Sequence, residues 1–476
     1  MLDFSREEGR YVLKDYGQYK RLIKFISSFV IVAAQVLIYY YVWMYYNTRI
    51  VEFPFFRKGN WLMAALYGVL LMFFLHMYGG FKISYLKKGN LIYSQILSVV
   101  IVNTITYFQI ALLDKRFHNP ALMLAMTLAD IVVIVIWAFF FQYIYSRMFP
   151  KKKMLLIYGE RPAFHLMDKI NSREDKYILA GAMPITCGID KIMEQMKDYD
   201  AMIIGDIPAH ERNQLMKMSF GAGIRTYTVP KISDILLRSS DELNVFDSPL
   251  YLSRNDGLQI EQRVTKRLVD IVFSAIGLLI SSPLFLIFAA AIKLTDGGPV
   301  FYKQERLTIG GKHFWIYKFR TMIRDAEKKD GPRLAGEKDD RILPVGRILR
   351  RTRLDELPQL INILKGEMSL VGPRPERPEL AEIITQNIPE FAYRLKVKAG
   401  LTGYAQIYGK YNTTAYDKLK LDLTYIRNYS LRLDIRLMLM TPKIMLMKES
   451  TEGVKDDFVD PALKPIESKE QSGYSS

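Results

Sequence analysis

Two adjacent acids, Asp355 and Glu356, occur in the segment LDELPQL at residues 354–360, at the end of a strongly basic stretch. The arginines that precede them are Arg341, Arg347, Arg350, Arg351 and Arg353. One interpretation is structural, because acids at a helix start bind free backbone N–H groups. The other is chemical, with one carboxylate as a nucleophile toward phosphorus and the other as a ligand of a divalent cation.

The residues after the acids have the spacing of an amphipathic helix. Its apolar positions are Leu357, Leu360, Ile361 and Leu364. Gly366 is a suitable residue to end that helix. The acids are therefore predicted at a helix N-terminus, where the helix dipole favours anions. Adjacent helical positions point about 100° apart, so the two carboxylates must have different tasks.

Other polar motifs in the last third of the chain suit phosphate chemistry. Residues 372–375, GPRP, present Arg374 between two prolines with little conformational freedom to lose, as suits a bidentate grip on phosphate. Lys318 and Arg320 belong to KFRTM, and Asp422 to KLKLDLTYIRNYS. Each motif alone is weak, because a DE pair is usually a cap and PRP is usually a loop. The inference of phosphate chemistry depends on their combination.

Composition indicates what kind of protein positions these residues. The chain has 476 residues, a net charge of +17 and 50% hydrophobic residues. This length predicts two or three domains. The basic character favours an anionic membrane surface or phosphate-bearing substrates, and the apolar spans described next disfavour nucleic acid. Cys187 is the only cysteine, so no disulfide framework and no thiolate metal site is available.

Four apolar segments predict a four-helix transmembrane bundle in residues 1–150. Three of them lack Asp, Glu, Lys and Arg and are residues 25–46, 59–81 and 89–113. The fourth lies between Arg116 and Arg147, where Asp130 is the only charge. Each is long enough to cross a hydrocarbon core of about 30 Å. A hydrogen bond to a neighbouring helix is a better explanation of Asp130 than a polar relay.

Basic residues gather on one side of these spans. Most flanking Lys and Arg lie in the N-terminal tail, in the connection between the second and third spans, and after the fourth span. By the positive-inside rule, the N-terminus and residue 151 are expected in the cytoplasm.

After residue 150 the pattern changes to apolar runs that alternate with helical ones. The runs that predict strands are 154–159, 177–183, 201–206 and 224–230, and those that predict helices include 188–199 and 210–220. This alternation predicts a Rossmann-like α/β domain over residues 151–240. Glu160 and Arg161 stand where a dinucleotide-binding turn has glycines, so we expect a scaffold, dimerisation or regulatory role and no redox cofactor. Residues 241–262 are expected to be a linker with a short strand.

Residues 271–292 are uncharged and long enough to span, but Ser281, Ser282 and Pro283 stand at their centre. Proline removes a helical hydrogen bond and clashes with the preceding turn, so a break is expected at Ser282 and Pro283. If the segment crossed the membrane, the basic last third would lie outside, away from nucleotide substrates. We therefore predict a re-entrant membrane helix over residues 266–293. An ordinary fifth span with a proline kink is the alternative.

Together these motifs resemble one family, the bacterial sugar transferases, which are monotopic phosphoglycosyl transferases. The matching region is about residues 263–449 and includes KFRTM, LDELPQL, MSLVGPRP and AGLTGYAQI. The whole chain resembles the large form of the family, in which four spans and a degenerate Rossmann-like domain precede an α-rich (α/β) monotopic catalytic domain. The resemblance implies transfer of hexose 1-phosphate from UDP-galactose or UDP-glucose to undecaprenyl phosphate with release of UMP. That reaction is the first membrane step of exopolysaccharide, capsule or O-antigen biosynthesis.

The same resemblance implies roles for individual residues. Asp355 would form a covalent phosphosugar intermediate, Glu356 would bind Mg²⁺, and Arg374 would bind phosphate. The other motif positions, with less defined roles in substrate binding, are Lys318, Arg320, Arg350 and Asp422. Arg347 and Arg353 are the candidates for contact with lipid headgroups. The expected setting is the bacterial plasma membrane, with a cytoplasmic catalytic domain and a homodimer.

Two other functions fit parts of the pattern. A phosphatase or hydrolase would use water as the acceptor, which the apolar hairpin beside the acids disfavours. A membrane-bound sensor would read a nucleotide through the α/β domain, which the intact acid pair and Pro-Arg-Pro motif disfavour. At the end of the chain, residues 431–449 predict an interfacial helix and residues 450–476 a tail, whose last residues, from about 464, are expected to be disordered.

Overall fold

The computed structural model describes residues 6–7, 10–11, 19–159, 164–171, 173, 176–245, 247–253, 257–323, 341–409, 413–445 and 462. It divides into two compact units, Met1–Val229 and Pro230–Ser476. The turn at Glu160 and Arg161 lies outside the described residues, and so does the tail 450–476 apart from Ala462.

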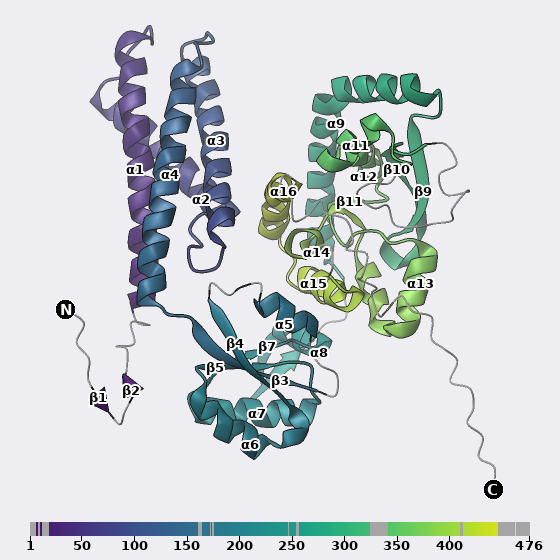
Figure 1. Ribbon diagram of the computed structural model, residues 1–476. Coiled ribbons are helices and arrows are strands. Elements are labelled where there is room, and N and C mark those ends of the chain that lie inside the picture. Colours follow the sequence, from purple (N-terminus) through teal and green to yellow (C-terminus); the bar gives the residue numbers. More distant parts are fainter. Residues whose placement is uncertain are drawn as a thin grey trace. The chain divides into compact units, whose positions relative to one another are not determined.

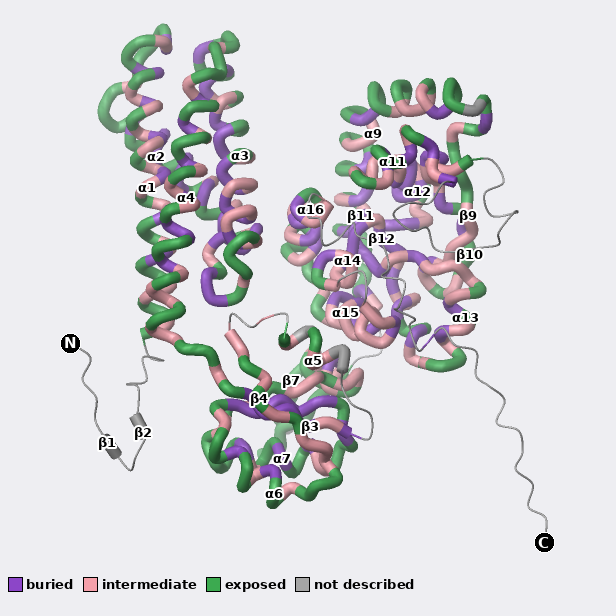
Figure 2. Tube along the Cα trace, viewed as in Figure 1, coloured by how far each residue is buried: buried purple, intermediate pink, exposed green. Residues whose placement is uncertain are grey.

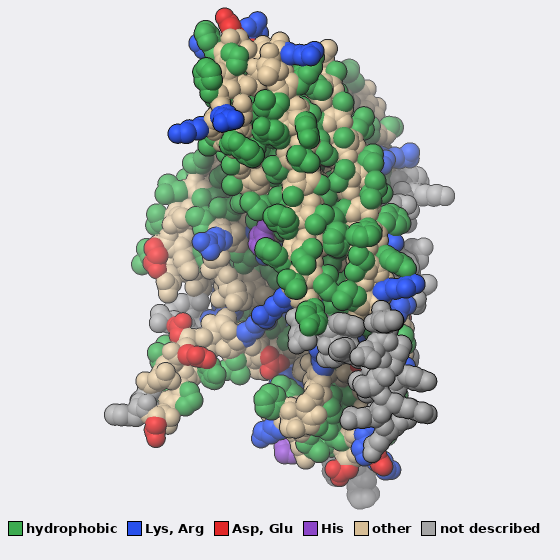
Figure 3. Space-filling view, turned by 90° about the vertical axis from the view of Figure 1, so that its left-hand side faces the viewer, with side chains coloured by type: hydrophobic (Ala, Val, Ile, Leu, Met, Phe, Trp, Pro, Cys, Tyr) green, Lys and Arg blue, Asp and Glu red, His purple; other side chains and the backbone are tan. Residues whose placement is uncertain are grey.

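The first unit contains four long apolar helices, which follow a short hairpin of β1 (Arg6–Glu7) and β2 (Arg10–Tyr11) (Figure 1). They are α1 (Lys20–Arg49), α2 (Arg57–Tyr78), α3 (Lys88–Leu113) and α4 (Ala121–Met148). Each is long and apolar enough to cross a membrane. Hydrophobic side chains cover the face of the helices that Figure 3 shows, with Lys and Arg toward the ends. The four expected apolar helices are therefore present.

A polar network connects three of these helices in the bundle interior. Asp130 is fully buried, and its Oδ2 accepts a hydrogen bond from Asn103 Nδ2 at 3.1 Å. Asn103 Oδ1 in turn accepts a hydrogen bond from the Tyr67 hydroxyl at 2.9 Å. Because Tyr67, Asn103 and Asp130 belong to α2, α3 and α4, the acid links neighbouring helices, as its structural interpretation predicted.

The first unit continues into a four-stranded parallel sheet with strand order β4-β3-β5-β6. The strands are β3 (Lys152–Tyr158), β4 (Tyr177–Pro184), β5 (Ala201–Ile204) and β6 (Arg225–Thr228), and the helices are α5 (Phe164–Asn171), α6 (Ile189–Gln195) and α7 (Ala209–Gly221), with 3-10 turns at Ile185–Cys187 and Met196–Asp198. The central strands β3 and β5 are the most buried part of this fold (Figure 2). The expected parallel α/β arrangement is confirmed.

The second unit begins earlier than expected, at Pro230 instead of after residue 240. Helix α8 (Ile232–Arg238) buries Ile235 in the main core of the second unit. Arg427 Nε also donates a hydrogen bond to Ser239 Oγ at 2.9 Å. The expected linker 241–262 holds a hairpin of β7 (Asp241–Val245) and β8 (Ser248–Leu252), followed by the start of α9.

Helix α9 (Ile260–Asp296) contains Pro283 and turns sharply between two arms (Figure 1). Ser281 Oγ donates a hydrogen bond to the Gly277 carbonyl at 2.6 Å, and Ser282 Oγ donates one to the Leu279 carbonyl at 2.8 Å. These hydroxyls bond carbonyls of the turn that precedes the proline. The helix bends, but it remains helical through Ser282 and Pro283, so the placement of the break at these two residues stays a prediction. Since α9 is also long and apolar enough to be a fifth span, its re-entrant path stays a prediction.

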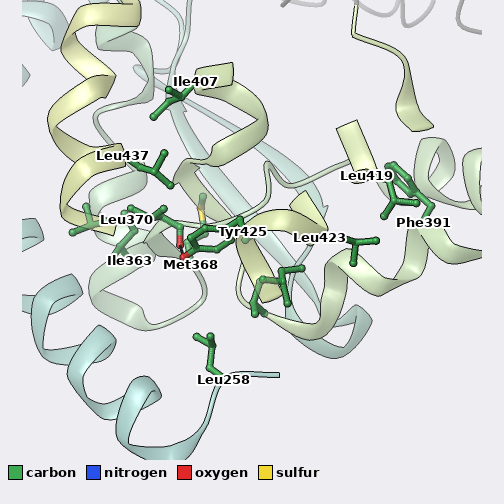
Figure 4. Packing of buried hydrophobic residues seen from close by; sticks show 14 of the residues in the cluster. Leu258, Ile363, Met368, Leu370, Phe391, Ile407, Leu419, Leu423, Tyr425 and Leu437 are labelled. Atoms are coloured by element: carbon green, nitrogen blue, oxygen red, sulfur yellow. Dashed lines mark hydrogen bonds between the residues drawn. The ribbon is translucent and has the colours of Figure 1, made fainter. Parts of the chain in front are cut away.

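The remaining elements of the second unit pack around a main hydrophobic cluster, part of which Figure 4 shows, and around a smaller one that contains Ile292, Phe319 and Leu349. They are β9 (Phe301–Leu307), β10 (His313–Phe319), α11 (Pro344–Thr352), α12 (Gln359–Lys365), β11 (Ser369–Val371), α13 (Pro378–Asn387), β12 (Gly400–Thr402), α14 (Tyr404–Tyr408), α15 (Ala415–Arg427) and α16 (Leu431–Met445), with 3-10 segments at Ile309–Gly311, Leu354–Glu356 and Pro389–Lys396. Strands β9 and β10 form an antiparallel hairpin, and β11 pairs with β12 in parallel.

A helix is present where one was expected, as α16, and it is held against the core on one side, while its interfacial position stays a prediction. Leu437 is fully buried, and Asp434 forms an ion pair of 2.6 Å with Lys266 of α9. The opposite side remains accessible, since Leu431 and Ile435 are exposed. The described part of α16 has 15 residues, which is shorter than the candidate membrane spans in the described part of the chain.

A labelling experiment tests the path of α9. In a Cys187→Ser background, cysteines at Gln262 and Val300 should both react only with a reagent added to the cytoplasmic side, because a re-entrant helix returns to the side from which it starts. Pro283→Leu should shift some molecules toward periplasmic labelling at position 300, since a straightened helix is long enough to span. Periplasmic labelling at 300 with Pro283 intact would restore the fifth span.

Candidate active site

Asp355 and Glu356 lie in a 3-10 turn, Leu354–Glu356, between α11 and α12. Arg353 precedes the turn in a left-handed conformation with φ of 54°, which is unusual for a residue other than glycine. Asp355 remains partly accessible, whereas Glu356 is only 8% exposed. The apolar helix ends at Gly366 as expected, but it begins at Gln359, so the acids precede it and are not part of its first turn.

Two cations from different elements hold the Glu356 carboxylate. Glu356 Oε1 accepts hydrogen bonds from Lys318 Nζ at 3.1 Å and from Arg374 NH2 at 2.7 Å. Burial alone would raise the pKa of this carboxyl, but the charges of Arg374 and Lys318 outweigh burial and hold the pKa well below its ordinary range. Glu356 is therefore a carboxylate at any physiological pH.

Asp355 has the opposite electrostatic environment. Burial, and next the neighbouring charge of Glu356, raise the pKa of the Asp355 carboxyl from 3.8 to about 6, although Lys318, Arg350 and Arg374 act against this rise. The carboxylate is consequently ionised at neutral pH, but it is more basic than an ordinary aspartate. A partly accessible, unusually basic carboxylate beside fixed cations is suited to nucleophilic attack on phosphorus.

Arg374 is positioned by a buried ion network behind it. Arg394 NH2 donates a hydrogen bond to the Arg374 carbonyl at 2.9 Å, and Arg394 Nε donates one to Asp422 Oδ2 at 2.8 Å. Arg394 also pairs with Glu376 at 3.5 Å. Asp422, a predicted substrate-binding residue, is only 1% exposed and faces Arg394. Its place in the structure is that of a positioning residue, because Arg394 stands between it and the Pro-Arg-Pro loop.

Asn362 of α12, which the sequence motifs did not single out, positions the strand that carries Lys318. Asn362 is fully buried, and its Oδ1 accepts a hydrogen bond from the Tyr317 N–H at 3.0 Å. Its Nδ2 donates to the Trp315 carbonyl at 2.8 Å and to Glu367 Oε2 at 2.6 Å. Helix α12 is thus fixed to strand β10. The sequence signal for Asn362 was a polar amide within the apolar run at residues 360–364.

The other predicted arginines occupy different places. Arg350 of α11 is close enough to Asp355 for its charge to lower the pKa of that acid. Arg320 is buried at the end of β10, with its guanidinium against Gly298, where a Cβ would lie 2.1 Å from Arg320 NH1. Arg347 is exposed, but Arg353 is half-buried and its charge helps to lower the pKa of Glu356. Arg353 therefore acts on the acids, contrary to the expectation that it only faces lipid.

Both arms of α9 support the elements that carry the acids. In the first arm, Arg267 donates hydrogen bonds of 2.6 Å to the carbonyls of Ile363 and Leu364 at the end of α12. The same arm carries Asp270, which accepts hydrogen bonds from Ser369 Oγ and the Leu370 N–H of β11. In the second arm, Phe285 and Phe288 pack on Phe319 of β10. Ser282 and Pro283 lie between these two arms in the sequence of α9.

The two carboxylates are compatible with Mg²⁺ only when a substrate completes its ligands. No group of three His, Cys, Asp or Glu side chains that could hold a metal ion occurs among the described residues. Mg²⁺ commonly binds through one or two carboxylates together with water and substrate phosphates. Glu356 uses Oε1 for both cation contacts, so a carboxylate oxygen remains at each acid for such a shared site.

Arg374 also lines a cavity of about 550 Å³. It is lined by the Pro-Arg-Pro loop, by α13 and by the 3-10 segment Pro389–Lys396, and its lining is mainly apolar. Its volume is in the usual range for small-molecule sites. Arg374 thus lines this cavity and also donates a hydrogen bond to Glu356.

Comparisons with known proteins agree with this chemistry. The family model described as "Bacterial sugar transferase" matches residues 261–448. A UDP-N-acetylgalactosamine-undecaprenyl-phosphate N-acetylgalactosaminephosphotransferase of Aeromonas hydrophila is 35% identical over 262 residues, 52% of this chain and 59% of that protein. A UDP-glucose:undecaprenyl-phosphate glucose-1-phosphate transferase of Caulobacter vibrioides is 40% identical over 192 residues, 39% of this chain and 71% of that protein. An Escherichia coli protein with the same description is 41% identical over 198 residues, 40% of this chain and 42% of that protein.

The buried ion network of Arg394 with Asp422 and Glu376 leads to a prediction about stability. Arg394→Leu should lower the free energy of unfolding by about 3–5 kcal/mol, because it leaves the carboxylate of Asp422 buried without a partner. The double variant Arg394→Leu/Asp422→Leu should recover part of this loss, since neither charge then remains buried. The midpoint of thermal unfolding in detergent measures the effect. Equal midpoints for Arg394→Leu and the unmodified protein would show that the pair is not a buried support.

Proposed function

The chain belongs to the bacterial sugar transferase family, and we propose that it transfers a sugar 1-phosphate from a UDP-sugar to undecaprenyl phosphate, with release of UMP. The observation that supports this most directly is the acid pair itself. A basic, partly accessible Asp355 lies beside Glu356, whose cations Lys318 and Arg374 stand ready to neutralise phosphate charge. The relatives are named for the same type of reaction.

In the proposed first step, an Asp355 carboxylate oxygen attacks the phosphorus bonded to the sugar. A bond forms between this oxygen and phosphorus, and the phosphoanhydride bond breaks with its electron pair going to UMP. Arg374 and Lys318 would bind the phosphate oxygens on which charge accumulates. Because both cations are already fixed, one by strand β10 and the other by Arg394, they require little reorganisation when the substrate binds.

In the proposed second step, an oxygen of undecaprenyl phosphate attacks the same phosphorus and releases the Asp355 carboxylate. The product is a lipid diphosphate sugar, and the enzyme returns to its starting state. This course is ping-pong, because UMP leaves before the lipid phosphate reacts. The apolar arms of α9 would bring the lipid chain to the acids, since Phe285 and Phe288 pack directly on the strand that carries Lys318.

We propose that Glu356, together with the substrate diphosphate, would hold Mg²⁺. When bound, the cation would neutralise diphosphate charge and favour departure of UMP. The lowered pKa of Glu356 supports this role, because a metal ligand must be deprotonated.

The sugar is proposed to be a hexose without an acetamido group, from UDP-glucose or UDP-galactose. The Caulobacter and Escherichia relatives are named for glucose 1-phosphate, whereas the Aeromonas relative is named for N-acetylgalactosamine. Competition among UDP-glucose, UDP-galactose and UDP-N-acetylgalactosamine for the same enzyme would decide this, and preference for the last would overturn the proposal. The lipid-linked product would begin a polysaccharide such as exopolysaccharide, capsule or O-antigen.

The proposed location is the bacterial plasma membrane, with four crossings by α1 to α4 and with both α/β parts in the cytoplasm. The apolar helices support the membrane, and the basic flanks support the orientation. The first unit carries none of the proposed catalytic residues, so its proposed role is assembly of a two-fold homodimer. A monomeric mass of the full chain in native nanodiscs would refute that role.

The roles of the two acids are tested by separate variants. Asp355→Asn should abolish both UMP release and the covalent phosphosugar adduct, because an amide is a far weaker nucleophile. Glu356→Gln should lower the Mg²⁺-dependent turnover strongly. Glu379→Gln, which removes an exposed carboxylate of α13, is the matched control and should leave turnover unchanged. Turnover is measured as UMP release with and without undecaprenyl phosphate, and an adduct trapped on any residue other than Asp355 would refute the assignment.

The raised pKa of Asp355 predicts a pH profile. For the free enzyme, kcat/KM for the UDP-sugar should fall as the pH falls through about 6, because the attacking carboxylate becomes protonated there. Arg350→Gln should move this acid limb to higher pH, since the guanidinium of Arg350 lowers the pKa of Asp355. Arg351→Gln, on the exposed side of the same helix, is the control and should not move it. An identical limb in all three proteins would contradict the assignment.

A further inference from the structure

A second cavity lies in the second unit and shares no residue with the acid turn or with the cavity beside Arg374. Its volume is about 500 Å³. The lining comes from α8, α14, α15 and the first turns of α16, so four elements that are distant in sequence meet there. No role in the proposed transfer reaction falls on it.

Positive charge dominates this cavity. Three arginines line it, Arg238 from α8 and the pair Arg432 and Arg436 from α16. Arg432 and Arg436 are four residues apart, so they share one face of their helix, where like charges destabilise the helix. Asp234 is the one carboxylate in the lining, and its Oδ2 already accepts the backbone N–H of Lys231 at 2.7 Å.

The guanidinium groups have no protein acceptor among the described residues. Arg238, Arg432 and Arg436 form no ion pair and donate no hydrogen bond to another side chain or carbonyl in that part of the chain. Arg436 Nε is moreover buried without an acceptor. A buried donor without a partner is destabilising, whereas buried Arg394 of the same unit is paired with Asp422. An acceptor of negative charge would remove both the repulsion and the unsatisfied donor.

We propose that this cavity binds a phosphate group. Planar guanidinium groups recognise phosphate with several parallel hydrogen bonds, and three arginines from two helices line this cavity. Asn428 adds an amide and Tyr404 adds a hydroxyl and an aromatic face to the same lining. The volume suits a small phosphorylated ligand, whose phosphate comes either from a soluble compound or from a phospholipid headgroup. The proposal is independent of the proposed function, because it uses none of the catalytic residues.

The test uses the full chain in nanodiscs of neutral phosphatidylcholine and inorganic phosphate as the probe. The midpoint of thermal unfolding is followed as phosphate replaces chloride at constant ionic strength. Phosphate should raise the midpoint of the unmodified protein along a saturable curve. In Arg432→Gln/Arg436→Gln the apparent dissociation constant should rise by at least about tenfold, because charge-assisted hydrogen bonds are lost. Lys217→Gln/Arg225→Gln, which removes two exposed charges from the first unit, should respond like the unmodified protein.

A second arm distinguishes the two sources of phosphate. If the ligand is a headgroup, nanodiscs with phosphatidylglycerol should raise the midpoint of the unmodified protein and free phosphate should not. Arg238→Gln, on a different helix, should weaken whichever response is found, which guards against a folding defect confined to α16. The proposal is overturned if neither source raises the midpoint. It is equally overturned if the unmodified protein and the two arginine variants respond alike, since binding would then occur elsewhere.

Discussion

The buried carboxylate of Glu356 is the constraint on which the second unit depends. A charge in that position is costly unless cations reach it with good geometry, and both Lys318 and Arg374 meet the same oxygen. The two cations come from a strand and a loop that are far apart in sequence, so the fold must bring them together. Asn362 does this for Lys318 by fixing β10 to α12, and Arg394 does it for Arg374 through its carbonyl. The contacts that satisfy this one acid therefore fix Lys318 and Arg374 beside the acid turn.

The apolar helix α9 contacts the elements that hold Lys318 and the acid turn in place. Its first arm is fixed to the end of α12 through Arg267 and to α16 through Lys266, whereas its second arm packs aromatic rings on Phe319. Leu279 and Ile280, close to the bend, are 76% and 73% exposed, as expected for side chains that a lipid environment covers. The bend at Pro283 therefore lets one helix contact both supports of the acid turn while it exposes an apolar surface.

Local sequence patterns were sufficient to predict much of the fold. Uncharged runs marked α1 to α4, alternating runs marked the parallel sheet, and Pro283 marked the bend. The sequence patterns did not predict the features that tertiary contacts determine. Helix α8 follows the sheet in sequence but buries Ile235 in the second unit, and Asp422 faces Arg394 instead of the acids. Arg394 and Asn362 were missed because their partners are distant in sequence, so no spacing rule connects them.

The two neighbouring acids differ because only one of them is paired. Direct contacts with cations hold Glu356 ionised. Asp355 has cationic charges near it but no hydrogen bond or ion pair to a cation among the described residues, and burial raises its pKa. Had the cations been shared equally, both carboxylates would be stable anions and poor nucleophiles. The 3-10 turn prevents that sharing, because it points one side chain at Lys318 and Arg374 and leaves the other partly accessible. The difference between the two adjacent acids thus depends on the backbone geometry of this turn, which left-handed Arg353 directly precedes.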